Sequence, residues 1–73
     1  MAMEPIPFPA SSNIKGVEYD PDTQTMVVQY SRGHIYRYSP VTGEQAAGLA
    51  EAKSATEYIR TFVSDEAVEV RIE

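Results

Sequence analysis

The chain has 73 residues, of which 42 % are hydrophobic and 23 % are charged, the composition of one small globular domain rather than of a disordered segment. It has no cysteine, which excludes disulfides and thiolate metal clusters. Its net charge of −5 disfavours nucleic acid as a partner, because proteins that bind phosphate backbones usually present a basic face.

A core of this size contributes only about 3–5 kcal/mol of net stability, and such domains often gain more by association. We therefore expect a protein partner or self-association. The first twelve residues lack the basic and apolar regions of a signal peptide, and no stretch approaches the roughly 20 apolar residues of a membrane span. The expected location is the cytoplasm, without membrane contact.

Residues 1–10 form a proline-rich arm, with prolines at alternate positions 5, 7 and 9. Proline fixes φ and lacks an N–H, so the arm is expected to be extended and to lie outside helices and central strands. It can be a mobile terminus. Alternatively, Ile6 and Phe8, which alternate with the prolines, can dock on a neighbouring molecule. Residues 11–73 are expected to form a single domain.

Three short strands are predicted at residues 13–19, 25–30 and 35–38. The turn segments between them, "DPDTQ" and "SRGH", are short, which predicts an antiparallel meander. The second and third strands alternate in hydrophobicity. Their more apolar face is expected to meet the core and carries Met26, Val28, Tyr30, Tyr36 and Tyr38. Their outward face carries Thr25, Val27, Gln29, Ile35 and Arg37.

Two short helices are predicted after Pro40, each beginning with a capping box, Thr42 with Gln45 and Ser54 with Glu57. Apolar side chains along each helix are expected to cover the sheet: Ala46, Leu49 and Ala50 in the first, and Tyr58, Ile59, Phe62 and Val63 in the second. The final "VEVRIE" alternates cleanly and predicts a strand. The predicted fold class is therefore α+β, with a three-stranded antiparallel meander, two short helices and a C-terminal fourth strand that either joins the sheet or pairs with a neighbouring chain.

Catalytic and metal-binding patterns are weak. His34 is the only histidine and lies beside a turn, and no serine sits in a strand–elbow–helix motif, so a hydrolase triad is not expected. "DPDTQT" begins like a calcium loop, but Thr25 stands where glycine is needed and Ser31 where a bidentate glutamate is needed. We expect no catalytic residue, no cofactor and no metal.

The segment "HIYRY" at residues 34–38 offers two possible binding surfaces. Tyr36 and Tyr38 project from one face of a strand. If that face were open, their rings would form a stacking platform for unpaired bases, with Arg32 and Arg37 near the phosphates. If the rings instead cover the core, the candidate binding surface is the outward side with the turn, made of Arg32, His34, Ile35 and Arg37.

The segments "SSNIKGVEYD", "QTMVVQY" and "GHIYRY" followed by Val41 resemble the KTSC domain in the same order and at similar spacing. This short domain is named for the C-terminal region of some lysyl-tRNA synthetases and also occurs alone in bacterial and phage proteins. The resemblance covers roughly residues 11–63. The residues that carry most of it are Ser11, Ser12, Asn13, Tyr19, Asp20, Tyr36 and Tyr38.

Further along the chain, Ser54 and Tyr58 also match the family, whereas Thr56 stands where the family tends to have glycine. An RNA-binding role has been suggested for the family because of the synthetase association. Here the acidic balance and the ending "SDEAVEVRIE", in place of a basic tail, weaken that inference. We expect a non-catalytic protein-interaction or assembly module, a bacterial or phage accessory component that can also be assembled into a phage particle. The alternative is a module that binds single-stranded RNA or DNA.

Overall fold

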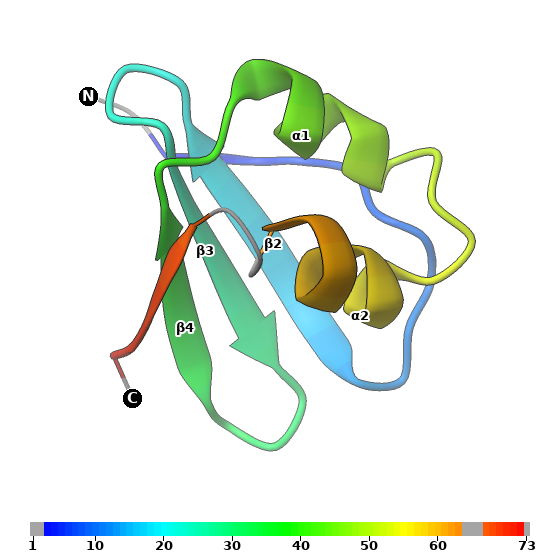
Figure 1. The fold of residues 1–73 in the computed structure, drawn as a ribbon. Coiled ribbons are helices and arrows are strands. Elements are labelled where there is room, and N and C mark those ends of the chain that lie inside the picture. The colour runs from blue at the N-terminus through cyan, green and yellow to red at the C-terminus, as the bar shows by residue number, and fades with distance from the viewer. Residues whose placement is uncertain (1–2, 64–66, 73) are drawn as a thin grey trace.

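Five strands form one antiparallel sheet in the computed structural model of the chain, which describes residues 3–63 and 67–72. The elements in chain order are β1 (Glu4–Pro5), β2 (Ile14–Asp20), β3 (Thr25–Tyr30), β4 (Ile35–Ser39), α1 (Gly43–Leu49), α2 (Ala55–Tyr58), the π-helical segment η1 (Ile59–Val63) and β5 (Val68–Arg71). The strands also lie side by side in chain order, from β1 at one edge to β5 at the other. Both helices pack on the same face of the sheet (Figure 1), which gives two layers.

The predicted α+β class is confirmed, but the sheet has five strands where the sequence predicted a three-stranded meander and a fourth strand. The additional strand, β1, comes from the proline-rich arm. Pro5 lies opposite Glu18, and the Ile6 N–H donates to Val17 O at 3.0 Å. A proline is tolerated here because one side of an edge strand needs no hydrogen bonds. The C-terminal strand, β5, pairs with β4 of the same chain.

The core lies between one face of the sheet and the helices. Its buried members from the strands are Ile14, Val17, Tyr19, Met26, Val28 and Tyr38, and those from the helices are Ala46, Leu49, Ala55, Ile59 and Val63. The prediction that the more apolar face of β3 and β4 turns inward is confirmed. The prediction for Ala50 is wrong, because α1 ends at Leu49 and leaves Ala50 exposed as its C-cap. The side chain of Phe62 lies outside the described part of the structure.

Both predicted helix starts are confirmed. The Thr42 hydroxyl accepts from the Gln45 N–H at 3.1 Å, and the Gln45 side chain accepts from the Thr42 N–H at 2.9 Å, which completes a capping box. At α2 only half of the predicted capping box is present among the described residues: the Ser54 hydroxyl accepts from the Glu57 N–H at 3.3 Å. Each of these bonds satisfies an N–H that the first turn of a helix leaves without an intrahelical partner.

Two tyrosine hydroxyls hold the helical layer in place. Tyr19 of β2 donates to Val41 O at 2.5 Å and so holds the segment before α1 against the sheet. Tyr58 of α2 donates to Gln45 O at 2.8 Å and joins the two helices. Gly48 makes room for this contact, because a Cβ at that position would collide with the Tyr58 hydroxyl.

Candidate functional site

The sheet face opposite the helices carries an apolar surface that no described element covers. Its members lie on β3, β4 and β5 and on the residue after β5: Val27, Ile35, Arg37, Val68, Val70 and Ile72. We call this set the open face. Arg37 lies directly opposite Val27 on one side and Val70 on the other, so the three strands present one continuous surface.

The apolar side of β5 belongs to the open face rather than to the core. Val68, Val70 and Ile72 are 66 %, 40 % and 50 % exposed, respectively. The charged alternates, Glu69 and Arg71, lie on the helix side of the sheet, opposite Tyr38 and Tyr36. Side chains alternate between faces along a strand, so pairing Val68 with Ser39 and Val70 with Arg37 fixes this orientation. The apolar side chains of β5 are therefore available for contact with another molecule.

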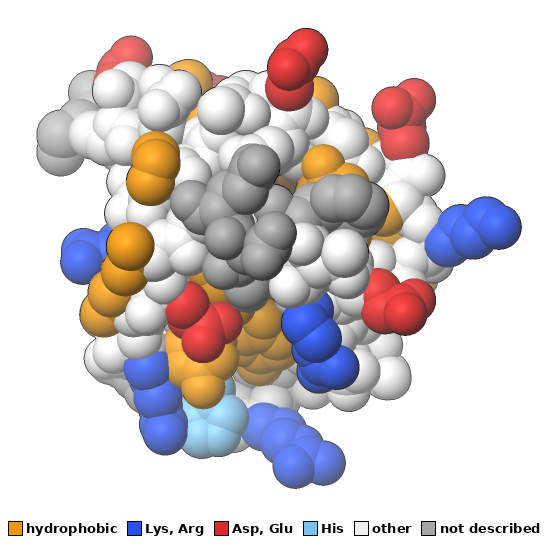
Figure 2. All heavy atoms as spheres, viewed as in Figure 1, with side chains coloured by type: hydrophobic (Ala, Val, Ile, Leu, Met, Phe, Trp, Pro, Cys, Tyr) orange, Lys and Arg blue, Asp and Glu red, His pale blue; other side chains and the backbone are white. Residues whose placement is uncertain are grey.

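A second candidate surface is a pocket of about 400 Å³ on the helix side. It lies between the β3–β4 hairpin, the helical segment 56–60 and β5. Its most buried lining residues are Tyr38 and Ile59, and Tyr30 and Tyr36 are half-buried. Figure 2 shows this hollow, with hydrophobic side chains at its bottom, Lys or Arg side chains around it and the single histidine beside it. The pocket thus combines an aromatic interior with a cationic margin.

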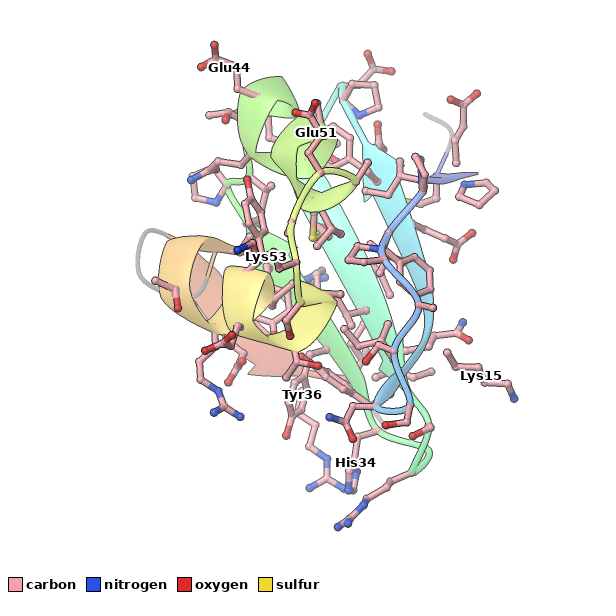
Figure 3. All side chains as sticks on the ribbon, turned by 90° about the vertical axis from the view of Figure 1, so that its right-hand side faces the viewer. Lys15, His34, Tyr36, Glu44, Glu51 and Lys53 are labelled. Carbon is pink, nitrogen blue, oxygen red and sulfur yellow. The ribbon has the colours of Figure 1, made fainter. Side chains whose placement is uncertain are left out.

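The cations of the pocket come from Arg32 and Arg60, and His34 lines the pocket beside them. Among the described residues, no hydrogen bond or ion pair engages either guanidinium. Figure 3 shows His34 and Tyr36 projecting close together at one end of the molecule. Glu69 supplies the pocket's carboxylate.

A hydrogen-bonded chain crosses the pocket. The Tyr30 and Tyr38 hydroxyls are 3.1 Å apart, and the Tyr38 hydroxyl donates to Glu69 Oε2 at 2.7 Å. The rings of Tyr30 and Tyr36 meet edge to face with their centroids 5.5 Å apart. Burial, with the hydrogen bonds to Tyr30 and Glu69, raises the pKa of Tyr38 far above its usual value of 10, and burial raises the pKa of Tyr30 as well. Both phenols are therefore neutral donors at physiological pH and are poor nucleophiles.

The pocket contains a buried polar atom for which the described residues provide no hydrogen-bond partner. The Thr56 hydroxyl is buried and makes no hydrogen bond within the described residues. Leaving a buried hydroxyl unpaired costs about 1–3 kcal/mol, so this group is an acceptor and donor that a ligand or water can satisfy.

The structure divides the residues that the sequence grouped as one binding surface. Arg32 and His34 line the pocket, whereas Ile35 and Arg37 belong to the open face on the other side of the sheet. The two tyrosines proposed as a stacking platform also differ, since Tyr36 is half-buried beside the pocket and Tyr38 is only 1 % exposed. These side chains therefore belong to two separate surfaces.

Ile6 and Phe8, the expected docking arm, are partly buried against the chain's own core. The arm continues from β1 past α1 to the start of β2 (Figure 1), so it closes one side of the core. These side chains contribute to the fold of this chain.

Sequence reasoning did not identify Arg60, Thr56 and Glu69 as neighbours of the β3–β4 hairpin. They come from a helix and a strand that lie 17 or more positions further along the chain, and no local spacing pattern links them. It also left open which side of the C-terminal strand is exposed. The available signal was the chain's limited helical apolar surface, which is insufficient to cover a second sheet face.

Within residues 3–63 and 67–72, no cluster of three or more His, Cys, Asp or Glu side chains is placed to hold a metal ion. No helix in this part of the chain has the length and apolar character required to cross a membrane.

Comparison with known proteins identifies a family that matches this chain in both sequence and fold. The family model of the KTSC domain matches residues 10–66. The crystal structure of a KTSC domain protein from Yersinia pestis superposes with a TM-score of 0.81 at 25 % identity, over 99 % of this chain and 100 % of that one.

Two curated relatives are similar in sequence. An uncharacterized protein of Stutzerimonas stutzeri is 41 % identical over 44 residues, which are 60 % of this chain and 62 % of that protein. A lysine–tRNA ligase of a Nostoc species is 34 % identical over 59 residues, which are 81 % of this chain and 10 % of the ligase. The chain therefore spans less than two thirds of the length of either relative.

Proposed function

Since the chain belongs to the KTSC domain family, we propose a function for it as a member of that family. In this proposal the chain is a non-catalytic protein-interaction module that assembles through its open face. The observation that carries this proposal is the exposure of the three apolar side chains of the C-terminal strand region, Val68, Val70 and Ile72. Contiguous apolar side chains on an uncovered sheet face are typical of surfaces that bind another protein. The neighbouring Arg37 and Ile35 extend this surface across β4.

The size of the domain supports assembly. The chain has 73 residues and no cysteine, so it has neither a large core nor a disulfide to stabilise it. Association that covers the open face would remove apolar surface from water, which contributes roughly 25 cal/mol for each Å² buried. An interaction role therefore also gives the fold additional stability.

The chemistry of the pocket supports a non-catalytic role. A histidine that acts as a general base needs a partner that orients its ring, and no described residue hydrogen-bonds to the ring of His34. The phenols of Tyr30 and Tyr38 are protonated at neutral pH, as phenols ordinarily are, and burial raises the pKa of both further, which disfavours the phenolate form that a nucleophile would need. This arrangement favours binding over bond-making chemistry.

Sedimentation velocity over a range of protein concentrations tests the proposal. We expect the wild-type chain to form larger species as its concentration rises, and the double variant Val68→Ser/Val70→Ser to remain monomeric. Met3→Ser is the matched control, because Met3 is an exposed apolar residue next to the opposite edge of the sheet, 36 % exposed, and its loss should leave association unchanged. The proposal is overturned if the wild type stays monomeric at millimolar concentration, or if the double variant associates as strongly as the wild type.

A second candidate function is the binding of a single-stranded RNA or DNA segment in the pocket. The observation that favours it is the half-buried ring of Tyr36 beside Arg32 and Arg60, which can stack on one base and contact its phosphates. The buried Tyr38 and the distant Arg37 do not contribute, and the net charge of −5 opposes binding.

Fluorescence anisotropy with a short labelled oligonucleotide tests the second candidate. Binding in the pocket predicts an affinity that falls steeply with salt and that Tyr36→Ala weakens without lowering the melting temperature to the same extent. Arg37→Ala is the control, because Arg37 lies on the open face and its removal should have little effect. Equal losses from both variants would refute a pocket-specific site.

A further inference from the structure

We infer that two copies of this chain pair through the free edge of β5, antiparallel and centred on Val70. This inference rests on the proposed function and identifies the partner as a second copy of the chain. The two edges of the sheet differ in a way that favours β5. The β1 edge is two residues long and lies in the segment with prolines at positions 5, 7 and 9, whereas β5 has four residues and no proline. Prolines and short strands protect an edge from pairing, and β5 has neither protection.

The hydrogen-bond phase of β5 determines which peptide groups face outward. The Ile72 N–H donates to Ile35 O at 2.7 Å, so the peptide groups of Ile72 point toward β4. Peptide groups alternate in direction along a strand, so those of Val70 and Val68 also point toward β4. The peptide groups of Glu69 and Arg71 therefore point away from β4, toward the outer edge of the sheet. An added antiparallel strand must hydrogen-bond to these two positions.

Only one two-fold register matches opposite charges at these positions. When the pair is centred on Val70, Glu69 lies opposite Arg71 of the partner subunit and Arg71 lies opposite Glu69 of the partner subunit. Centring the pair on Glu69 places two glutamates opposite each other, and centring it on Arg71 places two arginines opposite each other. Opposite charges directly across an antiparallel pair are stabilising and like charges are destabilising. The sequence "VEVRI" is thus complementary to itself in the Val70 register.

The same register also joins the apolar side chains. Val70 lies opposite its own copy at a position without ladder hydrogen bonds, where side chains approach most closely. Val68 lies opposite Ile72 of the partner subunit. The exposed valines and isoleucine of the two copies then form one apolar strip on the open face. Polar and apolar sides of β5 both favour the same alignment.

Disulfide cross-linking tests the register, because the chain contains no cysteine of its own. In the proposed pair the two Cα atoms at position 70 are about 4.5 Å apart, within the range that a disulfide spans. Val70→Cys should therefore give a covalent dimer rapidly under mild oxidation. Val68→Cys is the matched control, because its two copies are separated by about 13 Å along the strands. Cross-linking of Val68→Cys as rapid as that of Val70→Cys would overturn the inference.

A charge exchange provides a second test that does not depend on cross-linking. Glu69→Arg places arginine opposite arginine, and Arg71→Glu places glutamate opposite glutamate, so each variant alone should associate roughly tenfold or more weakly than the wild type. Mixing the two variants restores opposite charges at both positions and should restore association. Thermal melts of each variant establish that it is folded, since Glu69 also accepts a hydrogen bond from Tyr38.

The outcomes separate this inference from the proposed function. If Val68→Ser/Val70→Ser abolishes association but Glu69→Arg and Arg71→Glu each associate alone as strongly as the wild type, the open face is the interface and the β5 pairing is wrong. If the wild-type chain does not associate at all, both are wrong. The inference requires rapid cross-linking at position 70, weakened association of each charge variant alone, and recovery of association when the two charge variants are mixed.

Discussion

Replacing Tyr19 by phenylalanine tests how the sheet holds the segment that starts α1. The Tyr19 hydroxyl donates to Val41 O at 2.5 Å, and Val41 is fully buried. Removing the hydroxyl breaks that hydrogen bond. The Val41 carbonyl then lacks this donor in a site that water cannot reach. The expected loss in the free energy of unfolding is about 1–3 kcal/mol. For a domain of this size, that loss lowers the melting temperature by roughly 5–20 °C.

Urea denaturation followed by circular dichroism measures this loss. The midpoint should fall while the dependence of the free energy on urea stays constant, because the surface exposed on unfolding hardly changes. Tyr36→Phe is the matched control, since the hydroxyl of Tyr36 makes no hydrogen bond within the described residues, and it should change stability by less than about 0.5 kcal/mol. If Tyr19→Phe is no more destabilising than Tyr36→Phe, the bond to Val41 does not stabilise the fold as argued.

Three further predictions follow from the packing and the pocket. Gly48→Ala should lower the free energy of unfolding by about 1–3 kcal/mol, because the added Cβ collides with the Tyr58 hydroxyl. In a Tyr58→Phe background the same substitution should lower it by less, and a double-mutant cycle measures the difference. Thr56→Val should leave stability unchanged or raise it by up to about 1–3 kcal/mol, because it removes a buried hydroxyl without a partner, and a clear loss in urea denaturation would contradict this. Because the pKa of Tyr38 is raised in the folded state, the folded protein retains a proton that the unfolded chain releases above about pH 10. The free energy of unfolding is therefore constant below that pH and falls above it, by up to about 1.4 kcal/mol per pH unit. Urea midpoints measured between pH 9 and 12 should show this decline, and Tyr38→Phe should flatten it.

Local patterns were sufficient to predict the centre of the fold. The alternation in "TMVVQY" and "IYRY" identified both strands and the face that each turns inward, because burial of one face fixes the register of an antiparallel pair. The side chains of Thr42 and Ser54 identified the helix starts, because the caps form within three residues. These features depend on contacts between residues that are close in sequence.

Features that depend on distant segments were not predicted. Pairing of the proline-rich arm with β2 requires space at a sheet edge, which the arm's own sequence does not reveal. The orientation of β5 depends on its register with β4, and both of its faces are consistent with its alternation. The pocket is the clearest example, because His34 acquires Arg60 and Glu69 as neighbours only when the chain folds.

The difference between the two edges of the sheet limits how many copies of this domain can join. Prolines and a two-residue strand protect the β1 edge from pairing, which leaves the β5 edge as the favoured place to extend the sheet. If β5 pairs with β5 of a second copy, each copy then presents only its β1 edge to solvent, and growth stops at two. In that pair, the prolines near β1 would stop each copy from adding a further strand, so that the two copies would form a closed pair rather than a filament.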